Sequence, residues 1–132
     1  HTPDALASVL RALRSYTKKE LTLVFGCGGE RDIGKRREMG AIANRLADKI
    51  FITDDNPRTE DPSAVRKDIL ASCPNAKEIG DRAQAISEAI RQLKEGDIMV
   101  VAGKGHETVQ LIGAAKISFD DRNIVRKALA AI

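Results

Sequence analysis

Residues 53–59 concentrate side chains that could bind a small charged molecule. They include a carboxylate pair, an amide and a guanidinium, contributed by Asp54, Asp55, Asn56 and Arg58. The intervening proline restricts its own φ and disfavours the helical region for the residue before it, so these groups stand on a stiffened backbone. A guanidinium can grip a carboxylate with two parallel hydrogen bonds. The segment predicts a site for a molecule carrying both an acid and an amine, the alternative being a polar turn that caps the next helix.

Two further loops place glycines beside charged residues, each directly after an apolar run. In residues 26–32, backbone N–H groups and the charge of Arg31 suit an anionic ligand. In residues 103–107, the acid Glu107 lies near glycines that allow close approach of a ligand, so it is a candidate partner for an ammonium group. Neither loop is a complete nucleotide motif: arginine replaces the third glycine of a dinucleotide fingerprint, and the second loop lacks the leading glycine and the Ser or Thr of a Walker loop.

Hydrophobic periodicity predicts the elements that position these loops. Apolar runs at 21–25, 50–52 and 98–102 indicate strands, and the last is typical of a strand covered on both faces. Segments with the apolar spacing of an amphipathic helix lie before, between and after these strands. Residues 109–119 resemble a hairpin. Such alternation favours an α/β, Rossmann-like three-layer sandwich with a mostly parallel sheet and one antiparallel edge strand. The three polar loops should then converge at the carboxyl edge of the sheet.

Composition bounds the remaining possibilities. The 132 residues fit one domain, and 42% hydrophobic with 31% charged residues is an ordinary globular balance. The basic residues behind the net charge of +3 are scattered and form no basic patch interleaved with aromatic residues, which argues against nucleic acid as a partner. The sequence contains no apolar run long enough to span a membrane and no signal peptide. Cys27 and Cys73 are predicted to be buried, reduced thiols, with no metal site. Arg36 and Arg37 are interpreted as a solvated, basic helix start.

The chain resembles the C-terminal domain of a Mur ligase, of the kind that adds meso-diaminopimelate to a UDP-N-acetylmuramoyl-dipeptide. The resemblance rests on four segments that occur in family order across nearly the whole chain. One small departure is glutamate at position 30, where aspartate is common in the family. The matching segments are residues 1–6, 24–32, 55–58 and 102–107.

What the resemblance implies is an amide-forming ligase of the bacterial cytoplasm that uses ATP and Mg²⁺ and proceeds through an acyl phosphate. The Asp-Asn-Pro-Arg motif at residues 55–58 is the family's mark for meso-diaminopimelate. By that resemblance Asn56 and Arg58 bind the distal carboxylate with help from Arg31, and Asp55 shapes the loop or balances the arginine. Glu107 and the backbone of Gly103 would receive the distal ammonium group; His1 would lie beside the nucleotide.

The same resemblance implies that other parts of the machinery lie outside this chain. The N-terminal UDP-binding domain and the central ATP-binding domain, with its phosphate loop and Mg²⁺ ligands, would precede an excised domain spanning residues 1–132. We therefore expect no catalytic residue in this domain and no ATP turnover by it alone. Two alternatives are a phospho-receiver-like module, suggested by Asp54, Asp55 and Lys104, and a nicotinamide-dinucleotide-binding module, suggested by the glycines after the first strand.

Overall fold

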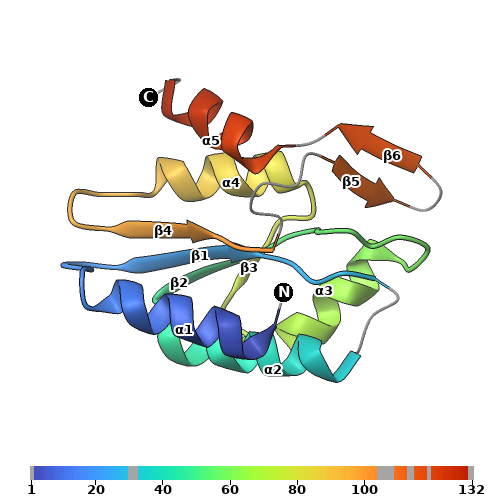
Figure 1. Ribbon diagram of the computed structural model, residues 1–132, viewed down its shortest axis with the longest axis horizontal. Helices are drawn as coiled ribbons and strands as arrows, with labels where there is room; N and C mark the ends of the chain where they lie inside the picture. The colour runs from blue at the N-terminus through green and yellow to red at the C-terminus, as the bar shows by residue number, and fades with distance from the viewer. Residues whose placement is uncertain (1, 30–32, 104–108, 113–114, 119, 131–132) are drawn as a thin grey trace.

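The described residues form five helices and six strands (Figure 1). The computed structural model describes residues 2–29, 33–103, 109–112, 115–118 and 120–130. In chain order the elements are α1 (Pro3–Arg14), β1 (Leu21–Phe25), α2 (Ile33–Leu46), β2 (Lys49–Ile52), α3 (Pro62–Leu70), β3 (Lys77–Glu78), α4 (Arg82–Arg91), β4 (Ile98–Val101), β5 (Val109–Ile112), β6 (Ala115–Ser118) and α5 (Asp121–Ala130).

Four parallel strands form the central sheet in the order β3-β2-β1-β4. Val24 of β1 pairs with Phe51 of β2 on one side and with Val101 of β4 on the other. Helices α1, α2 and α3 cover one face, whereas α4 covers the opposite face and α5 lies beyond it (Figure 1). The predicted three-layer α/β sandwich is therefore confirmed.

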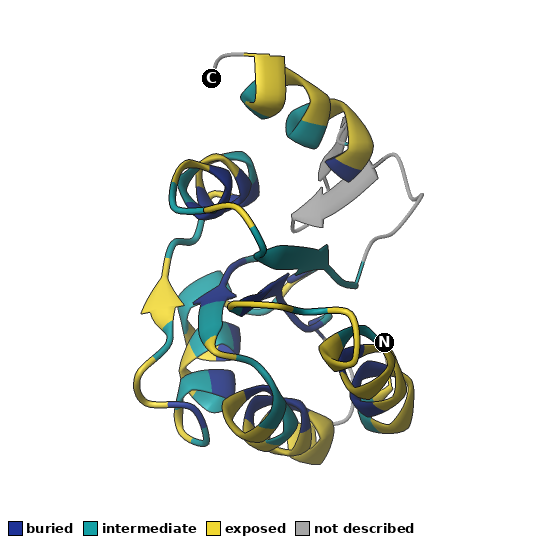
Figure 2. Ribbon diagram, turned by 90° about the vertical axis from the view of Figure 1, so that its left-hand side faces the viewer, coloured by how far each residue is buried: buried dark blue, intermediate teal, exposed yellow. Residues whose placement is uncertain are grey.

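Alternating side chains of the strands supply two separate cores. Leu23, Phe25 and Ile52 pack with the inward sides of α1, α2 and α3, whereas Val24 and Phe51 pack with α4. Because successive side chains of a strand point to opposite faces, an unbroken apolar run is what a sheet covered on both sides requires. Figure 2 shows the same division, with buried residues on the helix sides that face the sheet.

Strand β4 differs in one respect from its sequence pattern. Val100 and Val101 pack against the two opposite cores as predicted, but the strand's side chains are only half buried. The reason is position, since β4 forms one edge of the described sheet. The expected antiparallel edge strand is not among the four strands of this sheet; antiparallel pairing occurs instead between β5 and β6, in a separate two-stranded sheet.

Side-chain caps precede α1 and α5 where the sequence places them. Thr2 Oγ1 accepts a hydrogen bond from the N–H of Ala5, with proline at the first helical position. Asp120 accepts from the N–H of Arg122 before α5, whereas Asp121 is buried. Among the helices that the structure describes, none combines the length and apolarity needed to cross a membrane.

Candidate functional site

The loops that follow β1, β2 and β4 meet at the carboxyl edge of the sheet, as predicted. A methyl group added to Gly26, just after β1, would lie only 2.1 Å from the carbonyl oxygen of Thr53. One added to Gly103, after β4, would lie 3.6 Å from both Asp55 Oδ2 and the carbonyl oxygen of Gly26. The three loops are thus in direct contact, and glycine after β1 is what lets the loop after β2 approach its backbone.

The glycine-rich loop also forms the seat of the Asp-Asn-Pro-Arg segment. The N–H of Gly29 donates to the carbonyl of Asn56 at 2.7 Å. A methyl group on Gly29 would stand 1.8 Å from the carbonyl oxygen of Pro57, closer than non-bonded atoms can approach. The loop after β2 therefore covers Gly29, and the absence of a side chain at this position is what permits the contact.

Replacing Gly29 with alanine should destabilise the domain and displace the Asp-Asn-Pro-Arg segment. The added methyl group meets backbone rather than a flexible side chain, so one loop must move. Overpacking of this kind typically costs about 1–3 kcal/mol. Urea unfolding and the backbone amide shift of Arg58 would measure the two effects, and unchanged stability with an unchanged shift would contradict the contact.

Arg58 adopts a backbone conformation that is rare for its residue type. Its φ is +54°, and among the described residues no other non-glycine residue has a positive φ. Its Nη1 donates to the carbonyls of Gly29 at 3.0 Å and Asn56 at 3.3 Å, so both loops orient the guanidinium. A left-handed conformation at a non-glycine residue costs of order 1–3 kcal/mol and is found preferentially at functional sites.

Three other predicted binding residues are described by the structure. Asp55 and Asn56 precede Arg58 in the same loop, and Gly103 lies in the loop after β4. Asp55 and Asn56 are buried, at 1% and 5% exposure, and Asp55 Oδ2 faces Gly103. The structure thus brings together four of the predicted binding residues: Asp55, Asn56, Arg58 and Gly103. The remaining predicted residues, Arg31, Glu107 and the nucleotide-adjacent His1, lie outside the described residues.

The interpretation of Arg36 as a solvated residue is wrong. Its side chain is 2% exposed and forms ion pairs with Glu60 at 2.7 Å and Asp68 at 2.8 Å. Its Nη2 also reaches the carbonyl of Gly28 at 3.3 Å. Arg36 therefore joins the glycine-rich loop, the stretch just after the Asp-Asn-Pro-Arg segment and α3. Its neighbour Arg37 is exposed as predicted.

Two more arginines that the sequence did not single out hold the loop after β2. Arg66 pairs with Asp54 and with Glu78, while Arg82 donates to the backbone carbonyl of Asp54. Burial raises the pKa of Asp54, and the contact with Arg66 opposes that rise. Arg82 is fully buried against Asp121, with two bonds of 2.7 Å. Arg66 adjoins Lys67 and Arg82 adjoins Asp81 in the sequence, so nothing in their sequence context marks them as buried.

The cysteines are two buried free thiols, as predicted. Burial, together with the nearby charge of Asp55, raises the pKa of Cys27 to about 12. Burial likewise raises the pKa of Cys73 to about 11. The Cys27 thiol lies 3.7 Å from the sulfur of Met39 and belongs to the core under the glycine-rich loop. Such thiols are poor nucleophiles, because the reactive thiolate is disfavoured.

These raised pKa values predict that stability falls in alkaline solution. In the unfolded chain a thiol ionises near its ordinary pKa of 9.0, whereas the folded protein keeps it protonated. The stabilising contribution is therefore complete below pH 9 and lost as pH rises above it, for Cys27 by up to about 1.4 kcal/mol per pH unit. Urea unfolding from pH 8 to 10.5 would measure the slope. A Cys27→Ala, Cys73→Ala variant should lose part of it, and an identical slope would contradict the assignment.

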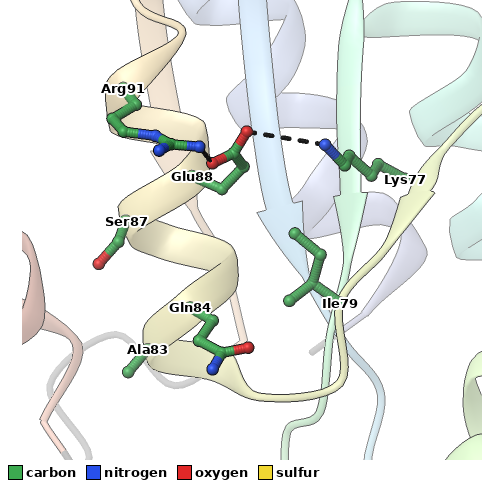
Figure 3. Close-up of a pocket in the computed structure, with 7 residues that line it drawn as sticks. All are labelled: Lys77, Ile79, Ala83, Gln84, Ser87, Glu88 and Arg91. Atoms are coloured by element: carbon green, nitrogen blue, oxygen red, sulfur yellow. Dashed lines mark hydrogen bonds and ion pairs between the residues drawn. The ribbon is translucent and has the colours of Figure 1, made fainter.

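A groove lies away from the loop junction, between β3 and α4 (Figure 3). Its volume is about 690 Å³. Glu88 lies between Lys77 and Arg91 and forms an ion pair with each. None of the predicted binding residues lines it. The lining residues are Lys77, Ile79, Ala83, Gln84, Ser87, Glu88 and Arg91. Within the described ranges, no group of three or more His, Cys, Asp or Glu side chains could hold a metal ion.

Curated proteins are similar to this chain over nearly its whole length. The UDP-N-acetylmuramoyl-L-alanyl-D-glutamate--2,6-diaminopimelate ligase of Bradyrhizobium diazoefficiens is 55% identical over 99% of this chain. The protein of the same description from Caulobacter vibrioides is 52% identical over the whole chain. The chain spans 27% of each relative's length.

Solved structures also share the fold of this chain. A UDP-N-acetylmuramoyl-L-alanyl-D-glutamate--2,6-diaminopimelate ligase superimposes with a TM-score of 0.93 and 45% identity, over 99% of this chain and 28% of the other. A bifunctional folylpolyglutamate synthase/dihydrofolate synthase from Yersinia pestis shares only the fold, with a TM-score of 0.61 and 19% identity over 78% of this chain and 24% of the other. The family model described as Mur ligase, glutamate ligase domain matches residues 1–105. With its three converging loops and this match, the chain belongs to the Mur ligase C-terminal domain family.

Proposed function

We propose that this chain is the amino-acid-recognising, C-terminal domain of a bacterial cytoplasmic ligase in peptidoglycan synthesis. The whole protein would use ATP to add meso-2,6-diaminopimelate to UDP-N-acetylmuramoyl-L-alanyl-D-glutamate. The names of its relatives support this substrate pair. The observation that carries the proposal is Arg58, whose left-handed backbone and two carbonyl contacts orient a guanidinium where the loops after β1 and β2 meet.

The chemistry of the incoming amino acid fits these residues. Meso-diaminopimelate carries at its far end an ammonium and a carboxylate, whereas lysine carries only the ammonium there. Arg58 and Asn56, with Arg31, would bind the far carboxylate; Glu107 and the backbone of Gly103 would receive the ammonium. Buried Asp55 would set the spacing between the loops. A guanidinium suits this task because its donors match both oxygens of a carboxylate.

In the whole protein the reaction would proceed in two steps, phosphorylation of the carboxylate and then formation of the amide bond. A carboxylate oxygen of the UDP-linked dipeptide attacks the terminal phosphorus of ATP, and ADP leaves. The amine of diaminopimelate then attacks the acyl carbonyl, phosphate departs and the nitrogen loses a proton. This domain would hold the amine at the acyl carbon, which converts a bimolecular encounter into a positioned one. As the family resemblance implies, ATP and Mg²⁺ would be bound mainly by the rest of the whole protein.

A substrate comparison with the full-length ligase carrying this domain would test the proposal. With ATP, Mg²⁺ and the UDP-linked dipeptide present, amide formation should occur with meso-diaminopimelate and be far weaker with L-lysine. Product mass and ADP release would be measured together, so that idle ATP hydrolysis is recognised. Equal use of lysine would contradict the role given to Arg58, and no product with either amine would contradict the proposed reaction.

A further inference from the structure

Arg82 connects four parts of the fold that are distant in sequence. It is the first residue of α4 and is 1% exposed. Its Nε and Nη2 each donate to the carboxylate of Asp121 at the start of α5, at 2.7 Å. Its Nη1 donates to the carbonyl of Asp54 at 3.0 Å, and Nη2 also donates to the carbonyl of Ala102 at 3.1 Å. One side chain of α4 thus binds α5, the loop after β2 and the loop after β4.

The two carbonyls that Arg82 binds belong to the residues just before site residues. Asp54 precedes the buried Asp55, and Ala102 precedes Gly103, whose φ is +108°. Across the junction, Asp55 Oδ2 lies in ordinary contact distance of a methyl group placed on Gly103. By fixing both carbonyls, the planar guanidinium fixes the separation of the loops that follow β2 and β4.

We propose that Arg82 is a positioning residue for the amino-acid site, and that Asp121 sets its orientation. The docking of α5 is thereby coupled to the geometry of the binding loops. The inference rests on the proposed function, because it assumes that these loops bind the incoming amino acid. Lysine could not replace Arg82, since one ammonium group cannot reproduce a rigid fork directed at a carboxylate and two carbonyls.

The packing of α4 separates this role from simple support of the helix. Ile86, Ala89 and Ile90 of the same helix are buried against Val24 and Phe51 of the sheet. These apolar contacts hold α4 in place without touching either loop carbonyl. An Ile90→Ala variant is therefore a matched control, because it weakens the packing of α4 and leaves the guanidinium contacts intact.

Steady-state kinetics of the full-length ligase would test the proposal, by comparing the wild type with the Arg82→Lys variant and the milder Asp121→Asn variant. We expect the KM for meso-diaminopimelate to rise roughly tenfold to a hundredfold, the range that small misplacements of reacting groups produce. The KM values for ATP and for the UDP-linked dipeptide should stay close to wild type. Ile90→Ala should lower the Tm without this selective change. An equal KM rise in the control, or an unchanged KM in folded Asp121→Asn, would overturn the proposal.

A second measurement distinguishes failure of this inference from failure of the proposed function. In the ligand-free full-length protein, Asp121→Asn should shift the backbone amide signals of Asp55 and Gly103, and Ile90→Ala should leave them in place. These shifts report loop geometry whether or not diaminopimelate is the substrate. A wild-type protein that does not use diaminopimelate would refute the proposed function alone, whereas unmoved amide signals would refute the positioning role.

Discussion

Replacing Arg58 with glycine should remove the use of diaminopimelate while leaving the domain folded and about as stable as before. Glycine adopts a positive φ without steric cost, so the substitution relieves the strain present at φ +54°. This gain offsets the loss of the Nη1 contacts to Gly29 and Asn56 and the greater freedom of glycine in the unfolded chain. The net change in the free energy of unfolding should be within about 1 kcal/mol.

The functional loss should be much larger than the change in stability. Truncating one partner of a desolvated charge pair costs roughly 2–5 kcal/mol, which corresponds to a loss of about 30-fold to more than 1,000-fold in kcat/KM for diaminopimelate. Affinity for ATP should be nearly unchanged. Steady-state kinetics of the full-length ligase, with each substrate varied in turn, would measure the split.

Two further variants at this position sharpen the comparison. Arg58→Ala should lose as much activity as the glycine variant but be less stable, because alanine keeps the strain and loses the carbonyl contacts. Arg58→Lys retains the charge but not the fork, so it should restore little activity. Equal damage to the use of ATP and of diaminopimelate would mean that the residue is structural.

Replacing Arg36 with methionine should strongly destabilise the domain. The substitution leaves the carboxylates of Glu60 and Asp68 without their shared buried partner and removes the contact to the Gly28 carbonyl. Losing one member of a buried ion pair typically costs about 3–5 kcal/mol. Because both carboxylates remain partly exposed and can be rehydrated, we expect roughly 2–4 kcal/mol here. Urea unfolding monitored by circular dichroism would measure this loss.

The adjacent residue offers a matched control for this prediction. Arg37→Met makes the same change of charge and side-chain shape on the same helix, but Arg37 is exposed. Its contact with Ser72 uses the backbone carbonyl, which the substitution retains. Arg37→Met should therefore change stability by no more than about 0.5 kcal/mol. Similar losses in the two variants would show that Arg36 contributes through charge or helix propensity rather than through its buried contacts.

Local patterns in the sequence determined the architecture and the place of the site. An apolar strand covered on both faces has the same continuous signature wherever it lies, so β1, β2 and β4 could be recognised from residues 21–25, 50–52 and 98–102. The alternation of strands and helices along the chain then required a parallel sheet, and the loops that follow its strands lie together at its carboxyl edge. For the same reason the loops that carry Asp55, Asn56, Arg58 and Gly103 could be predicted from the sequence to lie together, whereas their assignment to one binding site rests on the family resemblance.

Only the tertiary structure decided which charged residues are buried. Arg36 and Arg82 occupy helix positions that look solvated in the sequence, and their partners Glu60 and Asp121 are 24 and 39 residues away. A charge is stable in the interior only where distant groups satisfy it, and sequence periodicity carries no information about such pairs. The position of β4 at the sheet edge and the left-handed backbone of Arg58 were likewise set by neighbouring segments. Sequence therefore specified which residues meet at the site, while long-range packing specified what holds them there.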